Sequence, residues 1–145
     1  MAFWLLKSEP SAYSWAQLVR DGRGRWDGVR SHAAAAHLRA MRRGDLAAFY
    51  HSETGKEVVG IMKVVRIAYA DPTAKSEQEK KGNWVAVDVA PVKALARTVT
   101  LAEIKRDAVL HHMPMVRQGR LSVSSMTAVQ WKRLLALGAK QKTAR

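Results

Sequence analysis

Residues 45–68, DLAAFYHSETGKEVVGIMKVVRIA, constrain the fold of this chain more than any other stretch. Two runs rich in Phe, Tyr, Val and Ile flank a polar segment at 53–56. Gly55 in that segment can adopt the positive φ that a tight turn needs. The stretch therefore predicts two β-strands joined by a turn.

The first strand of this hairpin is mostly apolar on both faces. Ala47 and Phe49 alternate with Ala48 and Tyr50, and alternate side chains of a strand point to opposite faces. A strand of this kind belongs in a covered sheet or a small barrel rather than at an exposed edge. Gly60 in the second strand predicts a bulge or a close approach to the backbone.

Apolar spacing and capping patterns predict the other elements. Strands are expected at 2–6, 83–89 and 120–124, and helices at 15–20, 32–42, 101–105 and 128–137, with caps at Ser14, Ser31, Thr100 and Thr127. Residues 21–25 are expected to form a flexible basic loop, 71–82 a mobile surface loop and 111–118 an irregular segment. Pro91 should end the strand before it or place its continuation on a sheet edge, and Gly138 should end the last helix.

This order of elements predicts an α+β domain at residues 1–138, built on a small, mostly antiparallel barrel. Residues 139–145 form a short basic tail that we expect to be disordered. The chain has no internal repeat.

The charge balance points to a polyanionic partner. The chain has 25 Lys and Arg against 12 Asp and Glu, a formal net charge of +13. This favours DNA, RNA or an anionic membrane surface as partner, and a basic surface without such a partner is the alternative.

Other compositional features exclude several classes of protein. The absence of Cys excludes disulfides, thiol catalysis and Cys-ligated zinc. No apolar run approaches the ~20 residues of a membrane span, and the N-terminal FWLL is too short for a signal peptide. We therefore expect a cytoplasmic protein, associated with the nucleoid if the source is bacterial.

Trp26 is the first candidate binding residue. It lies in a Gly-flanked segment next to Asp27 and close to Arg30. Its indole either anchors the segment on the core or offers a face on which a nucleobase stacks. The residues alone leave these two interpretations open.

Tyr50, His51 and Ser52 end the first hairpin strand, where scaffolds often present side chains to ligands. They either form a pocket wall or are a core Tyr followed by surface residues. Lys7 and Glu9 either pair with each other or act on a ligand, and the sequence does not decide between these roles.

Arg117 and Arg120 flank Gly119 just before a predicted strand. Forked guanidinium donors suit phosphate contacts, although the segment by itself favours two solvated side chains.

Several familiar chemistries are missing from the sequence. It has no GxSxG elbow, no Gly-rich phosphate loop and no HExxH. Adjacent His111 and His112 would point apart in a strand, and His32 and His37 diverge on a helix. We predict no metal site, no cofactor and no catalytic residue.

Seven motifs occur in one order along nearly the whole chain. They are KSEP at 7–10, WDGVR at 26–30, GDLAAFYHS at 44–52, GKEVVGI at 55–61, WVAVDV at 84–89, TLAEIK at 100–105 and RQGRLSV at 117–123. With these motifs the chain resembles the EVE domain, a PUA-like family.

The resemblance implies a PUA-like pseudo-barrel of about five or six strands with short helices around it. It implies kinship with ASCH domains and with YTH domains, which grip a methylated adenine of RNA in an aromatic cage. It also implies a non-enzymatic, monomeric module that binds nucleic acid and recognises a modified base, notably a modified cytosine in DNA.

The resemblance also implies a site. The base pocket would draw on Lys7, Ser8, Trp26, Arg30, Ser31, Tyr50, His51, Ser52, Arg120, Leu121 and Ser122, and the phosphates would meet Arg23, Arg25 and Arg117. The family often has Asn after WDGVR, where this chain has Ser31, so the base preference is expected to differ.

Two alternatives belong to other functional classes. Some ASCH relatives are amidohydrolases that act on modified cytidine, and Lys7 with Glu9 could serve as acid/base partners here. A general RNA-binding PUA-like module would need only the positive charge and would ignore base modification.

Overall fold

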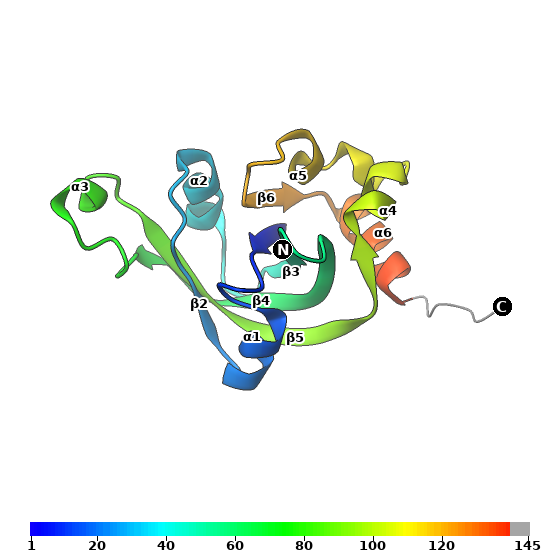
Figure 1. The fold of residues 1–145 in the computed structure, drawn as a ribbon, viewed down its shortest axis with the longest axis horizontal. Helices are drawn as coiled ribbons and strands as arrows, with labels where there is room; N and C mark the ends of the chain where they lie inside the picture. Colours follow the sequence, from blue (N-terminus) through cyan, green and yellow to red (C-terminus); the bar gives the residue numbers. More distant parts are fainter. Residues whose placement is uncertain (140–145) are drawn as a thin grey trace.

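The computed structural model describes residues 1–139, so most of the predicted tail at 139–145 lies outside the described residues. The strands are β1 (Phe3–Ser8), β2 (Gly24–Trp26), β3 (Leu46–His51), β4 (Glu57–Ala70), β5 (Val85–Thr100) and β6 (Val123–Met126). The helices are α1 (Trp15–Asp21), α2 (His32–Ala40), α3 (Glu77–Lys80), α4 (Leu101–Arg106), the 3-10 turn η1 (Leu110–His112), α5 (Pro114–Arg117) and α6 (Ala128–Ala139) (Figure 1).

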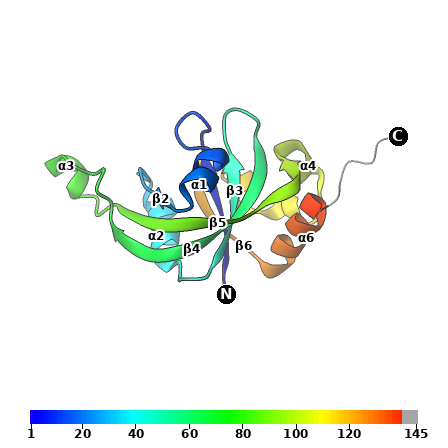
Figure 2. The same cartoon turned by 90° about the horizontal axis from the view of Figure 1, so that it is seen from below.

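The six strands form one sheet in the order β2-β5-β4-β3-β1-β6. β1 and β3 run parallel, and the other neighbouring strands run antiparallel. β4 and β5 are long and curved, with α3 near one end and α4 and α6 near the other (Figure 2). The predicted α+β class with six mostly antiparallel strands is confirmed, but the sheet of residues 1–139 is open, because no pairing joins β2 to β6.

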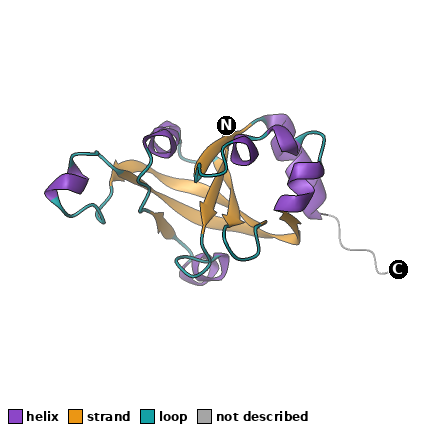
Figure 3. Ribbon diagram, turned by 45° about the horizontal axis from the view of Figure 1, so that its top comes forward, coloured by secondary structure: helices purple, strands orange, loops and turns teal. Residues whose placement is uncertain are grey.

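The core lies on both faces of the sheet. Ala47 and Phe49 of β3 belong to one buried cluster, whereas Ala48 and Tyr50 belong to a second cluster. The predicted position of this strand inside a covered sheet is confirmed by its place between β4 and β1. Figure 3 shows short helices on both sides of the strands.

Different helices cover the two faces. Leu18 of α1 and Leu38 of α2 are buried in the cluster that contains Phe49. Ile104 of α4 and Leu134 of α6 are buried in the cluster that contains Tyr50. No helix within residues 1–139 is long and apolar enough to cross a membrane.

The predicted helix starts are confirmed. Ser14 and Thr100 cap α1 and α4 in capping boxes completed by Gln17 and Glu103. Ser31 caps α2 by accepting a hydrogen bond from the backbone N–H of Ala34. Thr127 accepts one from the backbone N–H of Gln130 at the start of α6. These bonds satisfy helix-end N–H groups that would otherwise lack a partner.

Gly60 combines the two predicted features. The pairing of β3 with β4 shifts register between Phe49 and Tyr50, whose partners are Gly60 and Val58. The indole of Trp15 also lies against Gly60, where a Cβ atom would overlap with its ring. A side chain at this position would therefore displace α1 from the sheet.

Three segments predicted as loops or irregular chain contain regular structure. Residues 24 and 25, expected in a flexible basic loop, form β2 together with Trp26, and β2 pairs with residues 87–89 of β5. Residues 71–82 include α3, which begins with a Ser76–Glu79 capping box. Residues 111–118, predicted to be irregular, include part of η1 and all of α5. These elements have three or four residues each, too few to show a period in the sequence.

Several element ends also differ from prediction, and α2 ends at Ala40 rather than at residue 42. β5 does not end at Pro91 but continues to Thr100. Beyond residue 89 it pairs with β4 alone, so this part of β5 lies at a sheet edge, which was one of the two predicted outcomes. The last strand begins at Val123 rather than at residue 120. α6 continues past Gly138, where the missing side chain leaves room for Leu95.

Candidate functional site

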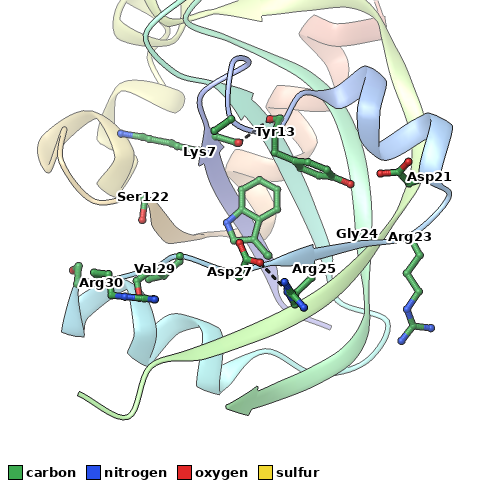
Figure 4. Close-up of a pocket in the computed structure, with 15 residues that line it drawn as sticks. Lys7, Tyr13, Asp21, Arg23, Gly24, Arg25, Asp27, Val29, Arg30 and Ser122 are labelled. Carbon is green, nitrogen blue, oxygen red and sulfur yellow. Dashed lines mark hydrogen bonds and ion pairs between the residues drawn. The ribbon is translucent and has the colours of Figure 1, made fainter. Parts of the chain in front are cut away.

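A cavity of about 500 Å³ opens beside the carboxyl end of β1. Its wall is formed by Lys7 and Ser8, by Tyr13, by Ser122 and by residues 23–31, and we call it the tryptophan cavity (Figure 4). Cavities of this size commonly hold small ligands in proteins. The wall brings together several segments from the first quarter of the chain and Ser122 from the last quarter.

Trp26 lies at the end of β2 and lines this cavity while remaining only 6% exposed. The indole packs edge-to-face against Phe49, with ring centroids 5.2 Å apart. Trp26 is thus both a core residue and part of the cavity wall. The two interpretations that the sequence left open are compatible in this geometry.

Gly24 lets the wall pack closely at the start of β2. A Cβ atom on Gly24 would overlap with the hydroxyl of Tyr13 and come within 3.0 Å of Leu18. The Tyr13 hydroxyl is buried and has no hydrogen-bond partner among the described residues. The side of the cavity between α1 and β2 is therefore tightly packed around an unsatisfied polar group.

The loop at residues 27–31 is held in place by Asp71, which follows β4. The Asp71 carboxylate accepts hydrogen bonds from the backbone N–H of Gly28 at 2.8 Å and from Nη1 of Arg30 at 3.0 Å. Thr73 adds its backbone N–H at 2.8 Å and its hydroxyl at 2.7 Å. The Asp71 side chain is 0% exposed. The anchoring is therefore a buried, charge-assisted network.

This network also sets the protonation state of Asp71. Burial opposes ionisation, but the hydrogen bonds from Thr73, Gly28 and Arg30 outweigh it and lower the pKa of Asp71 to about 2. Asp71 is consequently charged at neutral pH. Both terminal nitrogens of Arg30 form bonds within the protein, because Nη1 donates to Asp71, and Nη2 donates to the Thr73 hydroxyl at 3.0 Å and pairs with Glu79 at 3.5 Å.

Two arginines of the cavity rim are paired with carboxylates. Nη2 of Arg23 lies 3.0 Å from Asp88, and Nε of Arg25 lies 2.8 Å from Asp27. The side chains of Arg23 and Arg25 remain 57% and 47% exposed. Figure 4 shows Arg23 extending away from the cavity centre. Both retain solvent-facing donors that could contact an anionic strand.

Tyr50 and Ser52 line a second cavity of about 240 Å³, which shares Lys7 with the first. We call it the lysine cavity because Lys56 and Lys105 also line it. Nζ of Lys7 donates hydrogen bonds to backbone carbonyls in the segment 115–119, which fixes the ammonium group between the two cavities.

The remaining predicted site residues lie elsewhere. Nε2 of His51 accepts a hydrogen bond from the backbone N–H of Trp15 at 3.1 Å, and burial lowers the pKa of His51. Leu121 is buried in the core, Arg120 is exposed, and Arg117 lies 3.1 Å from Nδ1 of His112. None of these four predicted residues lines the tryptophan or the lysine cavity.

The tryptophan cavity thus gathers eight of the predicted residues: Lys7, Ser8, Arg23, Arg25, Trp26, Arg30, Ser31 and Ser122. The sequence interpretation missed Tyr13 and Asp71. Asp71 starts an Asp-Pro-Thr segment, and Asp side chains often accept hydrogen bonds from residues just after them in turns. That pattern could have predicted the turn but not its contact with residues 28 and 30.

The described residues do not form a cluster of metal-ligating side chains. Residues 1–139 contain no group of three or more His, Asp or Glu side chains placed to hold an ion. Lys7 forms no ion pair with a carboxylate within the described part of the chain, and Glu9 is exposed.

The fold and cavity define a small basic α+β domain with an aromatic-walled pocket at the end of a parallel strand pair. The EVE domain family matches residues 2–137 of this chain, and the chain belongs to that family. The predicted resemblance is confirmed.

Known relatives share both sequence and structure with this chain. Rpa0253 from Rhodopseudomonas palustris is 46% identical, with a TM-score of 0.86 over 95% of this chain and 93% of its own. Human thymocyte nuclear protein 1 is 32% identical over 95% of this chain and 74% of its own length.

Two solved complexes are also similar. Human THYN1 protein in complex with 5-methylcytosine-containing DNA is 31% identical, with a TM-score of 0.89 over 98% of this chain and 100% of that chain. The YTH domain of Zygosaccharomyces rouxii MRB1 protein, solved with N6-methyladenosine RNA, has a TM-score of 0.58 at 16% identity over 99% of this chain and 88% of its own. The second likeness shows a common fold.

Proposed function

We propose that this domain binds nucleic acid by taking a modified nucleobase, a modified cytosine of DNA, into the tryptophan cavity. The observation that carries the proposal is the convergence of Trp26, Lys7, Ser8, Arg30, Ser31 and Ser122 on one cavity of about 500 Å³. The complex of human THYN1 protein with 5-methylcytosine-containing DNA supports this choice of ligand.

The residues supply what base recognition needs. A base that leaves its stack loses a few kcal/mol, which new contacts must offset. The indole of Trp26 offers an apolar wall, and Ser122 offers a hydroxyl for the polar edge of a base. The Ser8 hydroxyl donates to the carbonyl of Tyr13 at 2.7 Å, so it offers a base an acceptor. Arg23 and Arg25 at the rim can meet phosphates, and the net charge of +13 favours a polyanion throughout.

The arrangement favours binding over catalysis. The ammonium group of Lys7 is held by the carbonyl oxygens of Met115 and Gly119. Burial lowers the pKa of Lys7, but these two hydrogen bonds fix its side-chain nitrogen as a donor, and no ion pair within residues 1–139 joins it to Glu9 to form half of an acid/base pair.

Calorimetric titration with two DNA strands that differ by one 5-methylcytosine tests the proposal. We expect the methylated strand to bind more tightly by about 1 kcal/mol or more, the effect of filling an apolar subsite. Ser122→Ala should weaken binding by about 1 kcal/mol, the value of a hydrogen bond. Ser125→Ala is the matched control, because Ser125 is exposed and does not line the cavity.

Trp26→Phe tests the aromatic wall while it keeps an aromatic ring beside Phe49. We expect it to reduce the preference for the methylated strand, and Trp131→Phe, in the opposite core cluster, to leave that preference intact. Equal binding of both strands by the unmodified protein would refute base reading. If RNA and DNA then bound alike and only salt altered affinity, the general nucleic-acid module would be correct.

A further inference from the structure

The lysine cavity has the composition of an anion site. Three ammonium groups line it, those of Lys7, Lys56 and Lys105, against the single carboxylate of Glu53. Its volume of about 240 Å³ is roughly half that of the tryptophan cavity. The excess of positive charge around a small concave site favours an anionic group over a neutral base.

The fold holds the lysines of this cavity together. The carbonyl of Lys56 accepts a hydrogen bond at 2.8 Å from the backbone N–H of Leu101, the first residue of α4. Lys105 lies four residues after Leu101 in the same helix, so both project from one helical face. The turn after β3 and the helix after β5 are thereby tied to each other at the cavity.

Hydroxyl groups complete the donor set. Tyr50 and Ser52 both line the cavity, and neither side-chain hydroxyl forms a hydrogen bond with the described residues, 1–139. A phosphate oxygen accepts from ammonium and hydroxyl donors alike. The cavity therefore offers several donors to one tetrahedral anion.

The two cavities are neighbours because of the parallel pair. Lys7 and Ser8 of β1 lie opposite Tyr50 and His51 of β3, so the carboxyl ends of both strands reach the same edge of the sheet. The backbone N–H of Ser52 donates to the carbonyl of Ser8 at 2.9 Å. Ser8 lines the tryptophan cavity, Ser52 lines the lysine cavity, and Lys7 lines both.

We propose that the lysine cavity binds the phosphodiester next to the nucleotide whose base enters the tryptophan cavity. The inference rests on the proposed function and assigns the path of the strand: from the inserted base, across the fixed ammonium group of Lys7, to Lys56 and Lys105. Base recognition and backbone anchoring are then joined through the ends of β1 and β3.

A charge-removal experiment tests this path. The double variant K56A/K105A is compared with K63A/K93A, whose lysines are exposed and line neither cavity. The probe is a short single strand with one 5-methylcytosine, titrated over a range of salt concentrations. We expect K56A/K105A to weaken binding about tenfold near physiological salt and to reduce the salt slope by about 0.7, the value for one phosphate of a single strand, and K63A/K93A to change both much less.

A second arm identifies the source of the phosphate. The same strand is prepared with one uncharged methylphosphonate linkage, placed on either side of the methylated cytosine. At one of these two positions, the methylphosphonate should weaken binding to the unmodified protein but have little further effect on K56A/K105A. The uncharged linkage and the loss of the two lysines would then remove the same contact. If the cavity instead binds free inorganic phosphate, the methylphosphonate should weaken binding to the unmodified protein and to K56A/K105A by the same factor. That result would overturn the proposal.

The outcomes separate this inference from the proposed function. If the unmodified protein prefers the methylated strand and the two double variants behave alike, the strand path is wrong and base reading stands. If the protein shows no preference for methylation but only K56A/K105A loses affinity and salt slope, base reading is wrong and the anion site stands. Thermal unfolding of both double variants verifies that each is folded.

Discussion

Arg30 and Asp71 form a charge-assisted hydrogen bond of 3.0 Å across a sequence separation of 41 residues. The bond joins the loop that lines the tryptophan cavity to the turn that follows β4. Because the Asp71 side chain is wholly shielded from solvent and also accepts from the N–H of Gly28, the loop is fixed at two adjacent points. The shape of the cavity thus depends on a residue that does not line it.

Asp71→Asn should destabilise the protein by about 2–3 kcal/mol. The carboxylate accepts from four donors contributed by Gly28, Arg30 and Thr73, whereas an amide has one acceptor oxygen and places an NH₂ group against donors. Urea denaturation measures the change. Glu79→Gln is the control, since Glu79 meets Arg30 at 3.5 Å and is 43% exposed. Glu79→Gln should destabilise the protein much less, because solvent screens this pair, and equal losses of stability in both variants would contradict the anchoring role.

The same carboxylate predicts an acid dependence. The pKa of Asp71 is lowered from 3.8 to about 2 in the folded protein. The contribution of the Asp71 carboxylate to stability is therefore complete above its pKa in the unfolded chain. It is lost as the pH falls through its pKa in the folded protein. The difference in unfolding free energy between the unmodified protein and Asp71→Asn should narrow by about 2 kcal/mol as the pH is lowered from about 5 towards 2. A constant difference over this range would show that the pKa is not lowered.

Local patterns predicted much of the fold. The alternation around Phe49 and Tyr50 placed these residues in separate clusters on opposite faces of the sheet, as the structure has them. The capping boxes at Ser14 and Thr100 could be predicted from the sequence, because the two residues of each box lie three positions apart. Signals of this kind operate within one or two turns of chain, so sequence alone captures them.

The site depends on contacts that have no local pattern. The bond between Gly28 and Asp71 spans 43 residues, and β2 is recognisable only through its pairing with β5. Tyr50 was expected beside Trp26, but Trp26 packs on Phe49, whose face is opposite to that of Tyr50. The alternation in β3 implied this separation, although the contact between Trp26 and Phe49 could not be foreseen.

Tyr13→Phe should leave stability unchanged or raise it by up to about 1 kcal/mol, because it removes a buried hydroxyl that has no partner among the described residues. Gly24→Ala should destabilise by about 1–3 kcal/mol through overlap with that hydroxyl. In the Tyr13→Phe background we expect the cost of Gly24→Ala to be smaller. Urea denaturation of the two single variants and the double variant measures the coupling, and strict additivity would exclude the contact as the cause.

His51 predicts a second pH dependence near neutrality. Burial lowers its pKa from 6.5, although Glu57 acts in the opposite direction. The neutral ring, which accepts from the N–H of Trp15, is favoured by folding. The contribution of His51 to stability should be complete above the pKa that its ring has in the unfolded chain. It should fall as the pH drops below that pKa. His51→Gln retains an acceptor without titrating, so its denaturation midpoint should lose this dependence, and an unchanged pH profile would contradict the assignment.

Ser31→Asn should alter base preference without altering stability. Ser31 caps α2 by accepting from the N–H of Ala34 at 3.3 Å, and its side chain also lines the tryptophan cavity. Asn and Ser are comparable N-caps, so stability should change by less than about 0.5 kcal/mol. The longer amide brings a donor and an acceptor to the cavity wall, which should shift the relative affinity for modified and unmodified cytosine by about 1 kcal/mol, roughly fivefold.

Ser14→Asn is the matched control for this change, because Ser14 caps α1 in the same way and does not line the cavity. Both variants are titrated with strands that differ only in the modification of one cytosine. If Ser31→Asn and Ser14→Asn keep the same preference as the unmodified protein, the residue after WDGVR does not face the base. A shift confined to Ser31→Asn would instead place the edge of the bound base beside the first turn of α2, since that is where the added amide lies.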